Sequence, residues 1–550
     1  MTTALDPVTT EIIARHVIST AEEMGAVLMR TAFSVNIKER HDCSTAIFNA
    51  RGEVVAQAEH VPIHLGSMIG AVESIKQRFP ESDIHPGDMF LANDPYTGGG
   101  SHLPDLNLVA PVFHDDRIVA YVANIAHHAD VGGMVPGSEA AICESIFQEG
   151  LRLPPVRLAR RGEVARDVFA IVLLNSRTPD EREGDLNAQL AANRIGIRAL
   201  EGLIARYGIE LFERALDSYL DFTERRLMAA IADLPDGRHE GEDFLGGDEP
   251  GTLARLACAL TVGQGRLSFD FTGTDPQLRY ARNIPNQALI ATVYCAVKAL
   301  LDPDAPANGG DFRVVDITAP AGCIVQPTPP AAVGTRSISC SVLSDVVLGV
   351  LAAAIPGRAF AGSGPHHLLV LAGTDPRNGR YFVDYETVAG ALGAQSHCDG
   401  LDAVRTLTSG SANLPVEALE HAFPLRIERY SLREGSGGAG AYRGGNGIVR
   451  DYRILGDDIT VSLSGERQHA PAPGAQGGGD GALGVFQLDP DGPAPRTLSA
   501  ALREEPLPRD TVIRVATPGG GGWGNPRDRE AGLVEKDARE GRTAPKGAVH

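Results

Sequence analysis

The sequence predicts a mixed α/β protein of several domains, helical and hairpin-rich toward its N-terminus and rich in β-strands and glycine toward its C-terminus. A chain of 550 residues is too long to fold around one hydrophobic core. Some segments have the apolar periodicity of helices and others that of strands. Changes in composition predict four parts: an N-terminal domain, a central α/β domain, a glycine-rich β domain and a polar tail (1–235, 236–425, 426–525 and 526–550).

The first elements can be predicted from periodicity. Residues 7–32 have the pattern of a long amphipathic helix, and Thr9 or Thr10 can cap its N-terminus. Residues 43–58 contain two apolar runs around a polar turn, which predicts a pair of strands. A second helix is expected near residues 66–79. The apolar stripe of the first helix consists of Ile13, Val17, Met24, Val27 and Leu28.

The middle of the chain mixes helical and strand-like segments. Residues 138–235 have mostly helical periodicity, and residues 253–277 predict another pair of strands. The apolar segments 286–301 and 341–358 predict buried helices.

Glycine is concentrated after residue 430, in the segments GSGGAGAYRGGNG, PGAQGGGDGALG and TPGGGGWGNP. None contains the GxxxxGK[ST] motif of a P-loop, and none opens a βαβ unit with a dinucleotide fingerprint. We therefore interpret these glycines as turn residues of a β-rich domain. The tail from about residue 526 is polar and is expected to be partly disordered.

The composition argues against several classes of function. With a formal net charge of −20 and no long basic run, the chain lacks the positive surface that nucleic acids require. No stretch approaches 18 uninterrupted apolar residues, and the N-terminus does not resemble a signal peptide, so we expect a cytoplasmic protein. The seven cysteines include no CxxC pair, which argues against a disulfide framework or a thiolate zinc site.

Most of the residues suited to chemistry lie between residues 93 and 133. The apolar runs 106–113 and 118–126 are joined by the short polar turn 114–117, which predicts a β-hairpin. With the turn centred near Asp115, the first strand begins opposite the end of the second. Residues at the open end of the hairpin should therefore lie close together.

This geometry predicts a cluster of imidazoles and carboxylates. Asp105 is expected opposite about residue 125, and His102 opposite about residue 128. Neutral imidazole with carboxylate suits a divalent cation such as Mn, Fe or Zn. A purely structural polar network is the alternative, but two histidine-bearing strand ends, each with an aspartate, favour a metal or catalytic site. The expected members are His102, Asp105, His127, His128 and Asp130.

Eight stretches, spread in order over roughly residues 5–525, resemble the hydantoinase B/oxoprolinase family. They are VNIKERHDCSTAIF, HVPIHLGSM, GDMFLANDPYTGGGSHLPDLNLVAPVF, NIAHHADVGG, IFQEGLRLPP, NLPVEALE, FPLRIERYSLREGSGGAGAYRGGNG and TPGGGGWGNP. The resemblance implies a subunit of an ATP-dependent hydrolase that opens a cyclic amide, such as a hydantoin, 5-oxoproline or a lactam. It also implies a hetero-oligomer with a hydantoinase A-type ATPase subunit, which binds ATP and phosphorylates the substrate carbonyl. The missing P-loop agrees with that division.

The resemblance also implies roles for individual residues. A divalent metal (Mn, Zn or Fe) would be bound by Asp42, His102, Asp105 and His127. Because a one-residue slip of register exchanges neighbours, His128 remains an alternative to His127. His128, Asp130 and Asp94 are the expected catalytic or substrate-facing residues, and His60 and Glu39 could support them.

Two other functions remain open. A related branch of the family carboxylates ketones such as acetone, and a scaffold subunit without chemistry of its own is also possible. Residues 390–403 depart from the glycine- and arginine-rich turn of many family members. If this segment lines the pocket, the substrate cannot be assigned by analogy.

Overall fold

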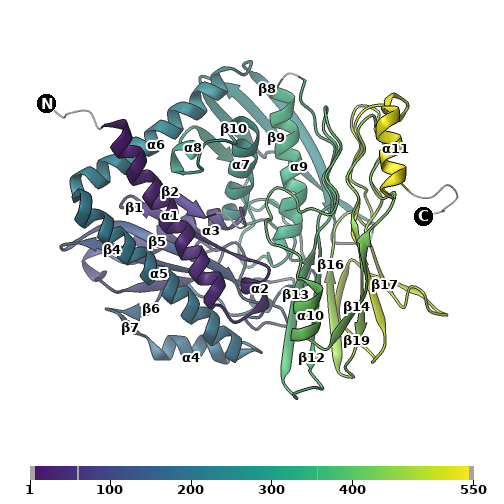
Figure 1. Ribbon diagram of the computed structural model, residues 1–550, viewed down its shortest axis with the longest axis horizontal. Helices are drawn as coiled ribbons and strands as arrows, with labels where there is room; N and C mark the ends of the chain where they lie inside the picture. The colour runs from purple at the N-terminus through teal and green to yellow at the C-terminus, as the bar shows by residue number, and fades with distance from the viewer. Residues whose placement is uncertain (1–5, 59–60, 250, 356, 544–550) are drawn as a thin grey trace.

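The computed structural model describes residues 6–58, 61–249, 251–355 and 357–543. In these ranges the chain forms a mixed α/β fold with four β-sheets, which confirms the predicted fold class. Figure 1 shows the helix-rich N-terminal part in purple to teal, beside C-terminal strands in green to yellow.

The largest sheet has its strands in the order β2-β1-β5-β4-β3-β6-β7, and all neighbouring pairs are antiparallel. Segment 156–164, within the range 138–235 that was expected to be mostly helical, instead forms two of these strands: β6 pairs with β3, and β7 pairs with β6. The strands are β1 (Cys43–Asn49), β2 (Val54–Ala58), β3 (Met89–Ala92), β4 (Asp105–His114), β5 (Arg117–His127), β6 (Val156–Arg160) and β7 (Glu163–Val164).

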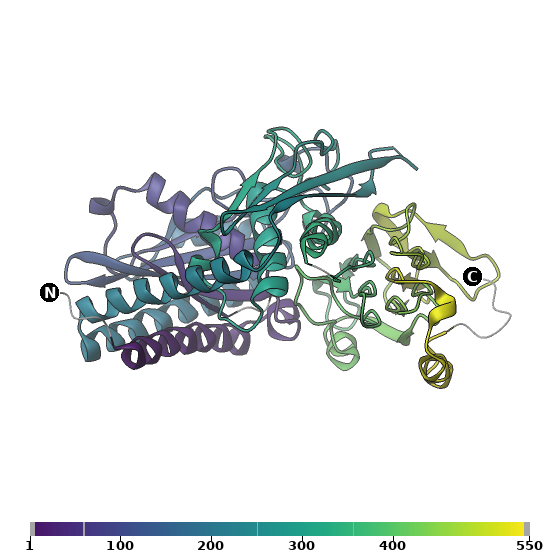
Figure 2. The same cartoon turned by 90° about the horizontal axis from the view of Figure 1, so that it is seen from above.

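Helices cover both faces of this sheet. On β5, Val122 packs toward the helices of one face, whereas Ala123 packs toward the single helix of the other. Both faces are therefore buried, which explains why these strands are almost continuously apolar. Figure 2 shows the first helix with the teal helices as a layer below the sheet. The helices are α1 (Pro7–Thr31), α5 (Pro179–Tyr207) and α6 (Ile209–Ala232) on one face and α3 (His64–Arg78) on the other; α2 (Val35–Lys38) and α4 (Arg166–Leu174) are shorter.

The long first helix lies where it was predicted, but its cap differs from the expectation. Asp6, not Thr9 or Thr10, is the N-cap, and its carboxylate accepts hydrogen bonds from the amides of Val8 and Thr9. Pro7 then occupies the first helical position, where its missing N–H costs nothing.

A second sheet carries its own helices and its own core. Its order is β11-β10-β9-β8, and α7 and α9 pack against it and against each other. Helix α9 is long and apolar enough to cross a membrane, but most of it is buried inside the protein. The elements are β8 (Gly237–Gly246), β9 (Leu253–Gly263), β10 (Arg266–Asp270), β11 (Val315–Thr318), α7 (Asn286–Leu301), α8 (Gly309–Phe312) and α9 (Arg336–Ala354).

The C-terminal part is a sandwich of two sheets around a shared apolar core. The first sheet has the order β13-β12-β16-β19, and the second has the order β14-β15-β20-β17-β18. The elements are β12 (His367–Thr374), β13 (Tyr381–Val388), α10 (Val416–Ala422), β14 (Leu425–Leu432), β15 (Ile448–Ile454), β16 (Ile459–Ser464), β17 (Val485–Leu488), β18 (Arg496–Leu498), β19 (Ala501–Leu507) and β20 (Val512–Ala516).

The glycine-rich segments pack against one another, which corrects their interpretation as turns. Segment 519–523 forms backbone hydrogen bonds with residues of four other segments: 361–364, 436–445, 472–482 and 392–394. A Cβ added at most of these glycines would lie about 2 Å from a neighbouring carbonyl group. Glycine is needed here for close approach of backbones. We call these five segments the glycine bundle.

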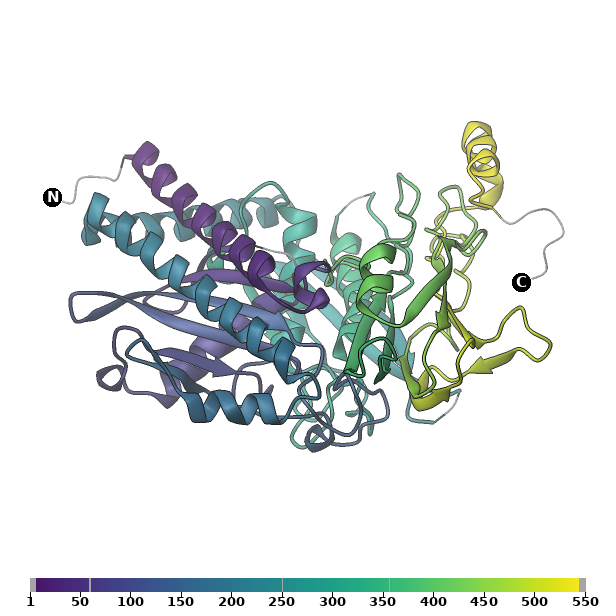
Figure 3. The same cartoon turned by 60° about the horizontal axis from the view of Figure 1, so that its bottom comes forward.

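Part of the polar tail forms a helix. Residues 531–539 form α11 (Ala531–Arg539), which lies at the outer edge of the C-terminal part in Figure 3. Arg529 links the start of this helix to Asp399 and Asp537 at 2.7 Å each. The remaining residues 544–550 lie outside the described ranges.

Candidate metal centre

The hairpin of β4 and β5 places the predicted residues, with a register that differs from the expected one. Asp105 pairs with His127, two residues beyond the expected partner. One residue of this shift arises because the turn is centred half a residue later than assumed. The other arises from a bulge between Val112 and Phe113. Because side chains alternate along a strand, a shift of two residues preserves the face. His127 therefore shares the face of Asp105, and His128 points to the other side.

Three of the predicted ligands converge at the open end of this hairpin. One ligand atom each from His102, Asp105 and His127 lies within 4.8 Å of the other two, and all three residues are buried. Among the described residues, Asp105 Oδ1 has no hydrogen-bond partner, and His102 Nε2 lies 3.0 Å from Asp105 Oδ2 without the geometry of a hydrogen bond. Buried polar atoms normally have partners, so atoms left free in a shared site fit ligands of a cation. The donor set of imidazoles and carboxylate also fits a divalent metal.

Asp42 and His64 extend the cluster on the side of strand β1. His64 Nε2 lies 3.6 Å from Asp42 Oδ1 and 3.6 Å from Asp105 Oδ1. Asp42 was predicted, whereas a role for His64 was not, although it belongs to the motif HVPIHLGSM. The predicted His60 lies outside the described residues, and Glu39 is half-buried at the end of α2.

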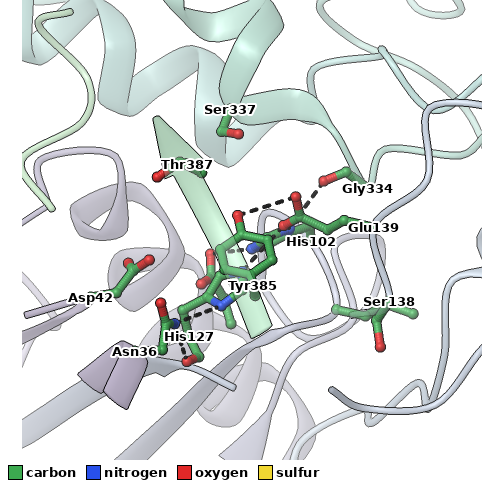
Figure 4. Close-up of polar contacts among 12 residues, drawn as sticks. Asn36, Asp42, His102, His127, Ser138, Glu139, Gly334, Ser337, Tyr385 and Thr387 are labelled. Atoms are coloured by element: carbon green, nitrogen blue, oxygen red, sulfur yellow. Dashed lines mark hydrogen bonds and ion pairs between the residues drawn. The ribbon is translucent and has the colours of Figure 1, made fainter. Parts of the chain in front are cut away.

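Glu139 is a member of the cluster that the sequence did not indicate. Its Oε1 lies 2.8 Å from His102 Nδ1 and 3.2 Å from His127 Nε2. Its Oε2 accepts a hydrogen bond of 3.2 Å from the hydroxyl of Tyr385, whose ring stacks on His127. Figure 4 shows these rings around the Glu139 carboxylate. A single glutamate in the loop sequence MVPGSEAA forms no sequence motif that would indicate a functional residue.

Charge inside the cluster is unbalanced in favour of carboxylates. Burial raises the pKa of Asp105, but His102 and Arg336 outweigh it and hold that pKa well below its usual value. Burial likewise opposes ionisation of Glu139, yet His102 lowers the pKa of Glu139 to about 2. Burial and Arg336 disfavour the protonated form of His102, and Asp105 with Glu139 nevertheless raises the pKa of His102 to about 9. A metal cation would replace that proton as the counter-charge of the carboxylates.

A small cavity adjoins the cluster. It has a volume of about 30 Å³, room for roughly two water molecules. Asp42, His64 and His127 line one side, and hydroxyl groups line much of the rest. A larger hollow of about 680 Å³ lies on the C-terminal sheet around Arg453 and Arg514, on different elements from the cluster. We assign the chemistry to the small cavity because Asp42, His64 and His127 of the cluster line it.

Two of the expected catalytic residues have hydrogen-bond partners away from the cluster. Asp94 accepts hydrogen bonds from the amides of Tyr96 and Thr97 and from Arg152 Nε at 2.5 Å. Asp130 accepts hydrogen bonds from the amides of Gly132 and Gly137 and from the amide and guanidinium of Arg177. Both carboxylates therefore shape the glycine-containing loops that flank the cluster.

His128 likewise lies on the opposite side of the strand from the cluster. Its Nε2 lies 3.0 Å from Gln189 Oε1 on α5, and Gln189 in turn donates to Asn124 and to the carbonyl of Leu106. This arrangement holds α5 against the sheet and leaves His127 as the histidine of this pair that faces Asp105.

We expect His128 to make the protein less stable as the pH falls from 6.5 to about 4. Burial, and next the Arg182 guanidinium, lower the pKa of His128 from 6.5 to about 4. In that interval the unfolded chain binds a proton that the folded chain does not, so this group lowers the free energy of unfolding by up to about 1.4 kcal/mol per pH unit. Urea unfolding of the wild type and of His128→Gln across this range measures the effect. The free energy of unfolding of His128→Gln should fall less steeply with decreasing pH than that of the wild type. Equal slopes for the two proteins would contradict the assignment.

Two further features concern the surroundings of the site. Cys143 is buried, and burial raises its pKa to about 12, so it is a small apolar residue and not a ready nucleophile. The divergent segment 390–403 does not line the small cavity. Its residues Leu392 and Ala394 instead form backbone hydrogen bonds within the glycine bundle.

The fold and the cluster together define a multi-domain α/β protein with a buried group of imidazoles and carboxylates. The sequence profile of the Hydantoinase B/oxoprolinase family matches residues 6–526, and the chain belongs to this family. This confirms the resemblance seen in the sequence.

Individual relatives are similar over nearly their whole length. The chain is 32% identical to the B-type subunit of a putative D-/L-hydantoinase of Pseudomonas sp. strain NS671, over 98% of this chain and 93% of the relative. It is also 32% identical to the beta subunit of the caprolactamase of Pseudomonas jessenii, over 99% and 95% of the two chains. The crystal structure of the ATP-dependent caprolactamase of that organism superposes with a TM-score of 0.90 at 27% identity, covering 99% of this chain and 96% of that one. Acetone carboxylase shares the fold, with a TM-score of 0.91 at 19% identity, covering 98% and 78%.

Proposed function

We propose that this chain is the metal-bearing subunit of an ATP-dependent hydrolase that opens a cyclic amide. The observation that carries the proposal is the convergence of His102, Asp105 and His127, with two of their ligand atoms left without hydrogen bonds. Together with Asp42, these side chains would hold a divalent cation, Mn, Zn or Fe.

When bound, such a cation acts as a Lewis acid and lowers the pKa of a water molecule toward about 7. The residues around it keep the ligands in place. Glu139 contacts both histidine rings, Arg336 holds Asp105 through a contact of 2.5 Å, and Asn36 contacts the second ring nitrogen of His127 at 3.0 Å. Such outer contacts orient metal ligands.

We assign positioning roles to the other expected catalytic residues. Asp94 and Asp130 hold the loops that carry the ligands, and His128 fixes the strand end against α5. Hydrolysis of the activated carbonyl would then depend on the cation site and on the hydroxyl-lined cavity beside it.

ATP would be bound by a separate hydantoinase A-type ATPase, which phosphorylates the carbonyl of the substrate. Two observations support this division. No P-loop or dinucleotide fingerprint is present in the sequence. The relatives are named as single subunits of a hydantoinase and of a caprolactamase, which implies that each has a partner chain. A hetero-oligomer in the cytoplasm is the corresponding assembly.

Metal removal from the reconstituted complex tests the proposal. The chain should contain a divalent cation, and with its partner ATPase it should open one of hydantoin, 5-oxoproline or caprolactam only when ATP is supplied. Treatment with a chelator should abolish turnover, and one of Mn, Zn or Fe should restore it. Metal content is measured by mass spectrometry and ring opening by chromatography.

Other results would assign a different function. ATP hydrolysis that requires both bicarbonate and a ketone would place the chain in the carboxylase branch. Full turnover by the partner ATPase alone would make this chain a scaffold. Turnover that survives complete loss of metal would overturn the metal-dependent mechanism.

A further inference from the structure

Thr387 is one of the residues that form the wall of the small cavity. It lies on β13, two residues after Tyr385, and is buried. It lines the same cavity as Asp42, His64 and His127. In Figure 4, Thr387 and Ser337 lie on the side of the site away from His127 and Asn36. Thr387 therefore borders a space that is shared with the proposed metal ligands Asp42 and His127.

Two guanidinium groups donate to this hydroxyl oxygen. Arg40 Nη2 and Arg405 Nη1 both form hydrogen bonds with Thr387 Oγ1. Arg40 is fully buried, and its other nitrogens donate to Asn36 Oδ1 and to backbone carbonyl groups. Within the described ranges, no carboxylate lies within salt-bridge distance of either arginine. The guanidinium groups of the buried Arg40 and the half-buried Arg405 thus meet at one uncharged oxygen.

This arrangement determines what the Thr387 hydroxyl can do. A hydroxyl oxygen has two acceptor lone pairs and one hydrogen. Both lone pairs are used by the arginines, so only the hydrogen remains for a further bond. No residue among those described accepts that hydrogen. The group is consequently a donor, and hydrogen bonds from two cations make it a stronger one.

The surrounding charge is also suited to a negative ligand. The two guanidinium groups that meet at Thr387 give this wall a positive potential. Burial, and next the charge of Arg40, lower the pKa of Arg405 to about 9, while the charge of Asp42 opposes the shift. A desolvated donor in such a potential interacts strongly with a developing negative charge.

We propose that the Thr387 hydroxyl donates a hydrogen bond to a negatively charged oxygen of the activated substrate, across the cavity from the metal ligands. Arg40 and Arg405 are positioning residues that fix and polarise this donor. The ligand class is an oxyanion: an oxygen of the phosphorylated carbonyl, or of the inorganic phosphate that its hydrolysis releases. This inference rests on the proposed function.

Thr387→Val is the decisive variant, because valine keeps the shape and removes the hydroxyl. In the complex with the partner ATPase, kcat should fall on the order of 10²-fold, the usual effect of losing one such donor. Thr387→Ser should restore most of the activity. Thr406→Val is the matched control, since its hydroxyl is buried on the neighbouring segment but donates to Ser341 at 2.8 Å and does not line the cavity. Metal content and melting temperature are measured for every variant.

A second measurement does not depend on turnover. Calorimetric titration of the metal-loaded chain with inorganic phosphate should show binding that is weakened at least about 10-fold in Thr387→Val and retained in Thr387→Ser and Thr406→Val. This result would stand even if the complex opened no cyclic amide, so failure of the proposed function is distinguishable from failure of this inference.

Three results would overturn the inference. These are a wild-type chain that binds no phosphate, a Thr387→Val variant that matches Thr406→Val in both measurements, and a Thr387→Ser variant as impaired as the valine variant. If Thr387→Val does not fold, a crystal structure of the wild-type chain with phosphate decides. An oxygen within hydrogen-bond distance of Thr387 Oγ1 supports the proposal, and an anion seen only elsewhere overturns it.

Discussion

Replacing His102 by alanine is expected to empty the proposed metal centre and to lower the proposed ATP-dependent turnover on the order of 10³-fold. His102 is fully buried, with Nε2 3.0 Å from Asp105 and Nδ1 2.8 Å from Glu139. Alanine removes one ligand and also the imidazole that lies between the carboxylates of Asp105 and Glu139. The remaining residues would hold a divalent cation poorly. Metal analysis of the purified chain and ring-opening kinetics of the complex measure both effects.

His114→Ala is the matched control for this experiment. His114 ends strand β4 of the same hairpin, at the turn, and its side chain is 41% exposed. It should retain the metal content and turnover of the wild type. If His102→Ala also retained both, the cluster would be a structural polar network and the proposed centre would be wrong. Loss of activity with full metal content would instead assign His102 to the reaction and not to metal binding.

Replacing Gly520 by alanine is expected to destabilise the protein by about 4 kcal/mol or more, enough to prevent folding in a marginally stable protein. A Cβ at this position would lie 2.2 Å from the carbonyl oxygen of Leu392. That neighbour is backbone within the glycine bundle, so it cannot move aside as a flexible side chain would. Soluble yield and thermal unfolding followed by circular dichroism measure the loss.

Gly202→Ala provides the comparison for this variant. Gly202 lies on α5, and a Cβ there would meet no atom within 4 Å. Alanine is the better helix former, so this variant should be as stable as the wild type or more stable by up to about 1 kcal/mol. A Gly520→Ala protein with the same melting temperature as the wild type would show that the bundle tolerates a side chain. Close approach of the backbones would then not be the reason that glycine occupies these positions.

Much of the architecture could be predicted from local patterns. Helix α1 and helix α7 lie within one residue of the predicted ranges 7–32 and 286–301, because their apolar periodicity reflects one buried face or full burial. The β4–β5 hairpin was predicted because two apolar runs flank a short polar turn. The segment 156–164 falls within the range 138–235 that was expected to be mostly helical, yet it forms β6 and β7, because so few residues do not distinguish the period of a strand from that of a helix.

The candidate site shows where local patterns stop being informative. Pairing within one hairpin brought Asp105 and His127 together, and that proximity followed from the sequence. The choice between His127 and His128 needed the true register, which a bulge had shifted. Glu139 and Arg336 come from a loop and from helix α9, and Arg336 lies 231 residues from Asp105 in the chain. No local pattern reports contacts between such distant segments.

The classes of secondary structure, the hairpin with its imidazoles and carboxylates, and the family all follow from the order of the amino acids. The packing of the folded chain was needed to establish which side chains face the candidate site and that Asp94 and Asp130 have hydrogen-bond partners elsewhere. It also showed that glycines expected in turns pack backbone against backbone. Periodicity records only whether a residue is buried, whereas the partner of a buried group is set by how distant segments pack. At Thr387 that partner is a pair of arginines from separate parts of the chain.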